Sequence, residues 1–325
     1  MSQTQEILYL SRADIETLDF QMIDIIAAVE EAFKEKGTGK AEMPPKPGIH
    51  PLHDAFIHAM PAYLPGMSAA GIKWVSGYPE NFRQGLPYIS GLIILNDPNT
   101  GLPISVMDAT WITAKRTGAA TALAAKYLAR PDSKILGIIG CGVQGRSNLE
   151  ALQAVMKLEE VRAYDISSAN LHRYVDEMTT ESGITIKPVK NPREAVEGSD
   201  IIVTAGPILK HPSPTIEKSW AKVGVLACPV DFDSYWKPEA MLKMDKFYAD
   251  DIHQLEYYRS TGYFQNIPSV YAELGEVVSG RKVGRESADE RIMSMNLGVA
   301  IEDMAVAVKI YEEARRKGRG RKLPL

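Results

Sequence analysis

The spacing of apolar positions changes along the chain, and this change predicts two kinds of architecture. In the first third, short apolar runs at 7–10, 55–60, 71–76, 88–95 and 102–107 are typical of strands. Asp97-Pro-Asn-Thr-Gly101, between the last two runs, is a hairpin turn signal. From Met22 to Phe33, apolar residues share one helical face, with Asp19 as the candidate N-cap. We expect an α+β region with a mostly antiparallel sheet here.

The pattern is different beyond residue 110. The Ala-rich stretch 110–127 has strong helix propensity. Strand-like runs at 134–139, 160–165, 185–189 and 201–205 then alternate with helical segments at 144–156, 169–181 and 192–197, and two more strands are expected at 223–227 and 246–249. Such alternation predicts a parallel, doubly wound sheet. A last helix over 297–317 is expected to pack back on the first region, which makes that region discontinuous.

The sequence Gly140-Cys-Gly-Val-Gln-Gly145 lies between a predicted strand and a predicted helix. Gly140 permits the tight turn, Gly142 lets the backbone approach a pyrophosphate, and Gly145 allows close packing of helix and strand. The helix N-terminus offers N–H groups and partial positive charge to the phosphates. Strand, glycine turn, helix, strand and a terminal acid together indicate a Rossmann dinucleotide-binding unit.

The terminal acid is Asp165, twenty residues beyond Gly145. Its carboxylate suits the ribose 2′-hydroxyl of NAD and repels the 2′-phosphate of NADP. The residues after it, at 166–168, include no arginine that would reverse this preference. We therefore predict NAD as the cofactor, and we assign four more residues to its site: Thr117, Val143, Gln144 and Thr204.

Composition and charge limit the number of domains and the kinds of partner that we expect. A chain of 325 residues with 45% hydrophobic and 24% charged positions has room for about two globular domains. A net charge of −4 indicates neither a nucleic-acid nor a membrane partner, and the basic stretch 315–322 reads as a solvated, partly frayed tail. Two cysteines, no long apolar run and no signal-peptide pattern favour the cytoplasm. The six histidines have no metal-ligand spacing, so no metal is expected.

Several segments together resemble the ornithine cyclodeaminase/mu-crystallin family, which includes archaeal-type alanine dehydrogenases and ketimine reductases. They are His58-Ala-Met-Pro-Ala-Tyr63, residues 71–81, residues 112–131, the glycine turn, and Gly298-Val-Ala-Ile-Glu-Asp-Met304. The resemblance implies a homodimer. It also implies a discontinuous substrate-binding and dimerisation domain, which we place at 1–118 and 300–325, and a Rossmann domain at 119–299.

The same resemblance implies roles for three cationic residues. Lys73 corresponds to the family lysine that holds the substrate carboxylate and helps to move a proton; the alternative is a lysine at a strand edge that reaches solvent. Arg116 corresponds to a carboxylate-binding arginine, against the alternative of a surface arginine. Lys46 stands where the family commonly has another arginine, so it keeps the charge and loses the bidentate geometry.

Two further positions depart from the family pattern. His58 stands where the cyclodeaminases have a glutamate that receives the substrate's terminal ammonium, and a histidine does not attract a cation there. The alternative is a half-buried strand histidine. The family aspartate near a Cys-Pro pair has an ambiguous register here. Asp231 is the candidate acid/base, Ala227 is the alternative match, and Asp233 is equally available as a helix cap.

The first hypothesis is therefore an NAD(H)-dependent oxidoreductase of amino acid metabolism that acts on a small amino acid or a cyclic imino acid, as a dehydrogenase or a ketimine reductase. His58 disfavours the second hypothesis, an ornithine cyclodeaminase-type ammonia lyase that uses NAD catalytically. The third hypothesis is a ligand-binding protein like mu-crystallin, and Lys73, Arg116 and the intact glycine turn argue against it.

Overall fold

The computed structural model describes residues 5–325, and contacts between Cα atoms divide the chain into two compact units. The first unit runs to Arg116 and resumes at Val299, and the second is Thr117–Gly298. Among the described residues, no helix is long and apolar enough to cross a membrane.

The first unit contains a seven-stranded sheet with the order β15-β1-β6-β5-β4-β3-β2. Its neighbours pair antiparallel except β1 and β6, which are parallel, so the expected α+β region is confirmed. Its elements are β1 (Glu6–Leu10), α1 (Arg12–Glu16), α2 (Met22–Gly37), β2 (Gly48–Ile49), β3 (Phe56–Leu64), β4 (Ala69–Gly77), a 3-10 helix (Pro79–Gln84), β5 (Ile89–Asn96), β6 (Pro103–Asp108), α10 (Ala300–Lys317) and β15 (Arg321–Pro324).

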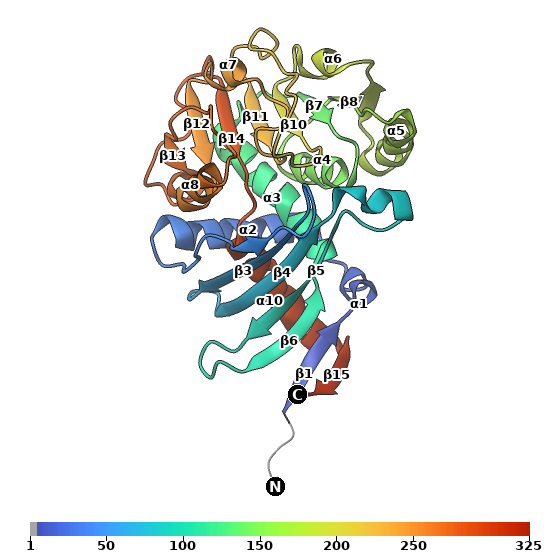
Figure 1. The fold of residues 1–325 in the computed structure, drawn as a ribbon, viewed down its shortest axis with the longest axis vertical. Coiled ribbons are helices and arrows are strands. Elements are labelled where there is room, and N and C mark those ends of the chain that lie inside the picture. The colour runs from blue at the N-terminus through green and yellow to red at the C-terminus, as the bar shows by residue number, and fades with distance from the viewer. Residues whose placement is uncertain (1–4) are drawn as a thin grey trace. The chain divides into compact units, whose positions relative to one another are not determined.

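One face of this sheet is covered by α10, which packs on β3, β4 and β5 and against α2 (Figure 1). Because side chains alternate along a strand, His58 and Met60 of β3 lie on the covered face, as do Lys73 and Val75 of β4. The sheet therefore directs a lysine and a histidine into its covered side. Trp74 points the other way and is half exposed.

Three local features of this unit differ from, or add to, what the sequence patterns indicated. Asp19 does not cap the second helix, because its φ is +56° and Gln21 is the N-cap. A short helix that the apolar pattern missed, α1, is capped by Ser11, with Asp14 completing a capping box. The basic tail is not frayed throughout, because β15 pairs antiparallel with β1. Because this strand is held by main-chain hydrogen bonds and its side chains are mostly basic, no alternating apolar pattern reveals it in the sequence.

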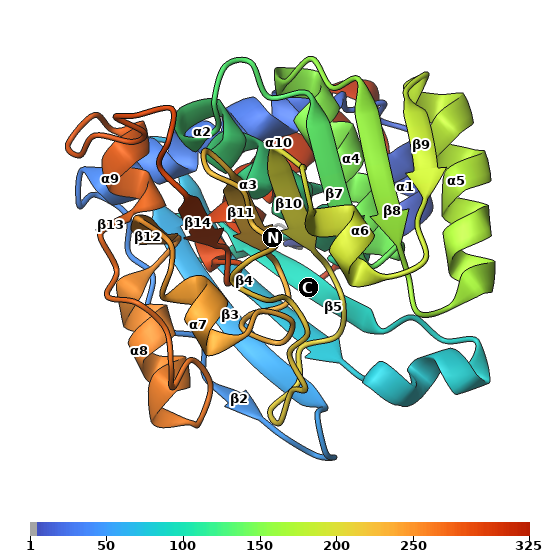
Figure 2. The ribbon, with the colours of Figure 1, turned by 90° about the horizontal axis from the view of Figure 1, so that it is seen from above.

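The second unit contains an eight-stranded parallel sheet with the order β13-β12-β14-β11-β10-β7-β8-β9. Figure 2 shows α4 and α6 on opposite faces of β7 and β8, as a doubly wound fold requires. The elements are α3 (Thr110–Leu128, which begins in the first unit), β7 (Ile135–Ile139), α4 (Val143–Val155), β8 (Glu160–Tyr164), α5 (Ser168–Ser182), β9 (Thr185–Pro188), α6 (Pro192–Val196), β10 (Ile201–Thr204), β11 (Leu226–Pro229), α7 (Pro238–Met241), β12 (Lys246–Ala249), α8 (Ile252–Ser260), β13 (Ala272–Glu273), α9 (Leu274–Val278) and β14 (Ile292–Met295).

The order of strands reverses at β7, which has β8 on one side and β10 on the other. The glycine turn follows β7, so it lies at the switch point where ligands of such sheets bind, beyond the carboxyl ends of the strands. The expected Rossmann sheet is confirmed. The strand expected at 223–227 instead occupies Leu226–Pro229, so Asp231 lies two residues beyond its end.

Candidate functional site

Lys73 lies in the middle of β4, is 0% exposed, and faces the covered side of the sheet. Its Nζ donates hydrogen bonds to Asp303 Oδ1 at 2.7 Å and to Thr113 Oγ1 at 3.3 Å. Burial lowers the pKa of Lys73 from 10.5 to about 7; the charge of Arg116 acts in the same direction, and Asp303 opposes it. The alternative of a solvent-reaching lysine is excluded. Near neutral pH this side chain is therefore present both as the ammonium, which can release a proton, and as the amine, which can accept one.

Arg116, in α3, is also buried rather than at the surface. Its Nη1 lies 2.5 Å from Glu302 Oε2, and its Nε lies 3.2 Å from Asp303 Oδ1. Asp303 therefore contacts both cations, Lys73 and Arg116. Together these four side chains form a buried charge network in the first unit.

The two acids of this network, Glu302 and Asp303, were not singled out from the sequence. Both are 0% exposed and lie in the first turn of α10, where the helix dipole favours negative charge. Burial raises the pKa of Glu302, and Arg116 opposes this shift. A signal was present, because adjacent acids in an otherwise apolar helical stretch are costly unless they have partners.

His58, on β3, is buried against Phe56, with the two ring centroids 4.3 Å apart. Burial, together with the charges of Lys46, His50 and Lys73, lowers its pKa from 6.5 to about 3. The imidazole is therefore neutral across the ordinary pH range. Lys46 is itself buried, and its charge also depresses the pKa of Lys73. The structure thus brings Lys46, His58, Lys73 and Arg116 into one electrostatic cluster.

The glycine turn has the backbone geometry that its sequence predicts. Gly140 has a φ of +100°, and a Cβ there would lie 2.6 Å from the carbonyl oxygen of Ala205. A Cβ on Gly145 would lie 2.3 Å from the carbonyl oxygen of Gly140. These two positions require glycine for the fold of the protein itself.

Gly142 is different, because a Cβ there would meet no heavy atom within 4 Å. This residue is the N-cap of α4 and gives the helix no side-chain cap. Val143 beside it is 65% exposed, and Gln144 is half-buried. The N-terminus of α4 therefore presents backbone N–H groups over open space, which fits a dinucleotide pyrophosphate.

Asp165 follows β8, next to the glycine turn. Its Oδ2 accepts a hydrogen bond from the Cys141 N–H at 2.8 Å, and its Oδ1 accepts one from the Ser167 N–H at 2.8 Å. These bonds fix the carboxylate beside the turn, where the sequence argument requires an acceptor for a ribose hydroxyl.

Asp231 is 0% exposed and joins the segments that follow β10 and β11. Its Oδ1 accepts from Thr204 Oγ1 at 2.7 Å, and its Oδ2 accepts from the Gly206 N–H at 2.9 Å. Burial raises the pKa of Asp231 from 3.8 to about 7, against the effect of these hydrogen bonds. An exposed loop carboxylate is excluded, and the shifted pKa suits an acid/base.

Three other residues expected from the sequence to bind a ligand or cap a helix are Thr117, Thr204 and Asp233. Thr204 directs its hydroxyl to Asp231, as described above. Thr117 is buried in α3, where its carbonyl accepts from Thr121 Oγ1 at 3.4 Å. Asp233 caps no helix; its Oδ2 accepts from the Phe264 N–H at 3.1 Å.

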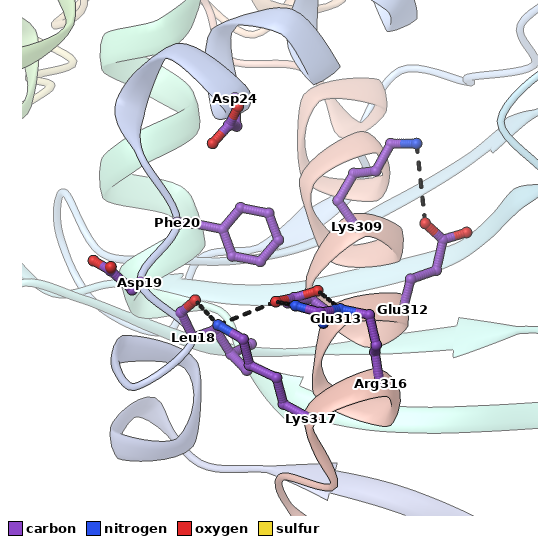
Figure 3. Close-up of a pocket in the computed structure, with 9 residues that line it drawn as sticks. All are labelled: Leu18, Asp19, Phe20, Asp24, Lys309, Glu312, Glu313, Arg316 and Lys317. Atoms are coloured by element: carbon purple, nitrogen blue, oxygen red, sulfur yellow. Dashed lines mark hydrogen bonds and ion pairs between the residues drawn. The ribbon is translucent and has the colours of Figure 1, made fainter.

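A hollow of about 520 Å³ lies elsewhere in the first unit, between the segment before α2 and the end of α10 (Figure 3). Its charged walls already have partners: Arg316 pairs with Glu313 at 2.5 Å, and Lys317 Nζ donates to the Leu18 carbonyl at 2.8 Å. None of the substrate-, cofactor- or acid/base-site residues expected from the sequence lines it. Within residues 5–325, no group of three His, Cys, Asp or Glu is placed to hold a metal ion.

Known proteins similar to this chain match it along nearly its whole length. An alanine dehydrogenase of Archaeoglobus fulgidus is 38% identical over 326 residues, which covers 98% of this chain and 98% of that protein. The solved structure of Thermococcus litoralis Δ(1)-pyrroline-2-carboxylate reductase, in complex with NADH and L-proline, is 39% identical, with a TM-score of 0.88 over 97% of this chain and 99% of that one. An archaeal alanine dehydrogenase dimer with bound NAD is 37% identical, with a TM-score of 0.87 over 99% of this chain and 100% of that one.

The model of the ornithine cyclodeaminase/mu-crystallin family matches residues 5–318. This match confirms the resemblance inferred from the sequence segments. The chain belongs to the ornithine cyclodeaminase/mu-crystallin family.

Proposed function

We propose that this protein is an NAD(H)-dependent oxidoreductase that acts on a small amino acid or a cyclic imino acid. The observation that carries the proposal is the buried cluster of Lys73 and Arg116, because cations held in a protein interior suit a substrate carboxylate. The open space over Gly142 and the fixed carboxylate of Asp165 fit NAD. Relatives with 37–39% identity bind NAD or NADH.

The residues of the buried charge network have two tasks, to bind the substrate carboxylate and to position the groups that bind it. Arg116 and Lys73 hold the carboxylate, with Lys46 adding positive charge, and the acids Glu302 and Asp303 fix the positions of both network cations. In amino acid oxidation the Cα–H bond breaks and its electron pair leaves as hydride, while the nitrogen loses one proton and a C=N bond forms. When bound, the nicotinamide of NAD supplies the hydride acceptor.

A protein group must take the proton that the nitrogen releases. Lys73 has a pKa near 7 and is one candidate, and Asp231, with a pKa raised to about 7, is the other. In imino acid reduction the same group returns the proton. Water attack on the imine completes an amino acid dehydrogenase, whereas a cyclic imine is reduced without that step.

The neutral imidazole of His58 supports oxidoreductase chemistry over the lyase alternative. An ornithine-type substrate brings a second ammonium, which needs an anionic partner. His58 carries no negative charge, and the charges near it that lower its pKa are cationic. The site therefore disfavours substrates whose side chains carry a positive charge.

A direct assay tests this function. Purified protein is incubated with NAD and L-alanine, L-proline or L-ornithine, or with NADH and Δ(1)-pyrroline-2-carboxylate, and nicotinamide absorbance and free ammonia are followed. The proposal expects net cofactor turnover with an alanine- or proline-type substrate. Ammonia release from ornithine without net turnover would instead support the lyase, and cofactor binding without product would support the ligand-binding protein.

We further propose a homodimer formed through the uncovered face of the seven-stranded sheet. Trp74, Leu92 and Ile94 are 47%, 46% and 36% exposed and lie side by side across β4 and β5. A contiguous apolar face of this kind marks an interaction surface, and the archaeal alanine dehydrogenase relative is a dimer. Two free thiols, Cys141 and Cys228, accord with a cytoplasmic location, which we also propose.

Sedimentation velocity tests the dimer. Trp74→Asp is expected to produce monomers, because it places a charge in the buried centre of the interface. The matched control is Leu242→Asp, at an exposed apolar position of the second unit, and it is expected to remain dimeric. A Trp74→Asp protein that sediments like the wild type would contradict this surface.

A further inference from the structure

Arg146 lies in the first turn of α4, one residue after the glycine turn. Its Nη1 donates to the carbonyl oxygen of Cys141, and also to that of Gly142 at 3.3 Å. Asp165 accepts from the N–H of the same Cys141. The backbone of Cys141 is therefore bound at its carbonyl by Arg146 and at its N–H by Asp165, the expected ribose-binding aspartate.

Cofactor choice can therefore depend on a basic residue outside the segment 166–168 that follows the second Rossmann strand. A guanidinium near the end of the second Rossmann strand is the group that accommodates a 2′-phosphate in NADP-binding proteins. Arg146 brings such a group to Cys141, the residue whose N–H donates to Asp165. Ile166, which flanks the carboxylate, is 94% exposed and leaves that side open.

Glu177, on α5, holds the guanidinium in its present direction. Arg146 Nε and Nη2 both donate to Glu177 Oε2, at 2.8 and 2.5 Å. The guanidinium carbon also lies 5.5 Å from the centre of the Tyr174 ring. Both contacts draw the arginine toward α5, and Glu177 cancels its charge.

We propose that Glu177 determines cofactor specificity by restraining Arg146. With Glu177 present, a 2′-phosphate meets the negative Asp165 while Arg146 is held by Glu177, so NADH is preferred. Without Glu177, Arg146 turns toward the 2′-phosphate and NADPH is accepted. This inference rests on the proposed function, because it assumes that the glycine turn binds a nicotinamide dinucleotide.

Calorimetric titration with NADH and NADPH tests the inference without a known substrate. In Glu177→Ala the NADPH/NADH affinity ratio is expected to rise about tenfold. The partly exposed Arg146–Glu177 pair is lost, and a charge-assisted contact between Arg146 and the 2′-phosphate is gained. The gain is expected to disappear in Glu177→Ala/Arg146→Ala. Glu181→Ala, an exposed acid on the same helix, is the matched control and is expected to leave the ratio unchanged.

The outcomes separate the inference from the function on which it rests. A Glu177→Ala protein that binds NADH but gains no NADPH affinity overturns the inference, and so does a gain that survives the loss of Arg146. A wild-type protein that binds neither dinucleotide overturns the proposed function instead. Glu177 is 44% exposed at its side chain, so both variants are expected to fold, and Glu177→Gln provides a second test with smaller change in shape.

Discussion

Asp303→Asn is the substitution that probes the buried charge network most sharply. Asp303 contacts Lys73 Nζ at 2.7 Å and Arg116 Nε at 3.2 Å, and it is 0% exposed. Asparagine keeps the shape of the side chain and removes its charge. Lys73 is then left with Thr113 as a neutral partner, while Arg116 keeps Glu302.

The expected size of the effect follows from the lost interaction. A hydrogen bond to a charged group contributes about 1.5–3 kcal/mol, and each pKa unit corresponds to about 1.36 kcal/mol. Loss of Asp303 should therefore lower the pKa of Lys73, now about 7, by about 1 to 2. Since only the protonated lysine carries the positive charge that holds the substrate carboxylate, kcat/KM for imino acid reduction should begin to fall at a correspondingly lower pH. At pH 7.5 we expect a loss of roughly tenfold or more.

The assay is kcat/KM for imino acid reduction with NADH, measured from pH 5 to 9. The substitution also removes a partner from a buried ion pair, which costs about 3–5 kcal/mol of stability, so NADH binding is measured in parallel to show that the protein is folded. Asp200→Asn is the matched control, because Asp200 is also a buried acid that pairs with cations, Arg130 and Lys222. If Asp303→Asn folds and its pH profile overlays the wild type, Asp303 does not set the protonation of Lys73 and the reasoning fails.

Further substitutions test the glycine turn and Asp231. Gly142→Ala should leave the melting temperature near that of the wild type and weaken NADH binding. Gly145→Ala should instead lower the melting temperature, because its Cβ would lie 2.3 Å from the Gly140 carbonyl oxygen. Equal melting temperatures for the two variants would contradict this. Asp231→Asn should remove one limb of the pH–rate profile and lower kcat by about 100-fold or more; a retained limb would show that Asp231 is not the acid/base. The raised pKa of Asp231 means that the folded wild type binds a proton more tightly than the unfolded chain, so it loses up to about 4 kcal/mol of stability as pH rises from about 4 to 7. Denaturant unfolding should show that Asp231→Asn lacks this loss.

The Rossmann sheet and its glycine turn could be predicted because their signals are local. Strand, turn and helix follow one another within about twenty residues, and each glycine has a separate steric reason to be there. The α+β character of the first region was also readable from short apolar runs. The capping box of Ser11 and Asp14 is also a local signal, and it marks the start of α1.

The charge network could not be derived in the same way. Lys73 and Asp303 are 230 residues apart in sequence, and their contact depends on how α10 lies across the sheet. The sequence pattern shows that successive side chains of β4 point to opposite faces of the sheet. It does not show which face a helix covers, so the sequence alone could not tell that Lys73 points inward and Trp74 outward. The pairing of β15 with β1 depends on main-chain hydrogen bonds, which side-chain composition does not report.

The central claim is that Arg116, with Lys73, binds the substrate through its carboxylate. The most direct measurement compares kcat/KM for the preferred amino acid with that for its uncharged amide, in the wild type and in Arg116→Gln. The account predicts that the wild type prefers the acid strongly and that Arg116→Gln loses about 10- to 100-fold of this preference, as one charge-assisted contact requires. An Arg116→Gln enzyme that discriminates acid from amide as well as the wild type would contradict it.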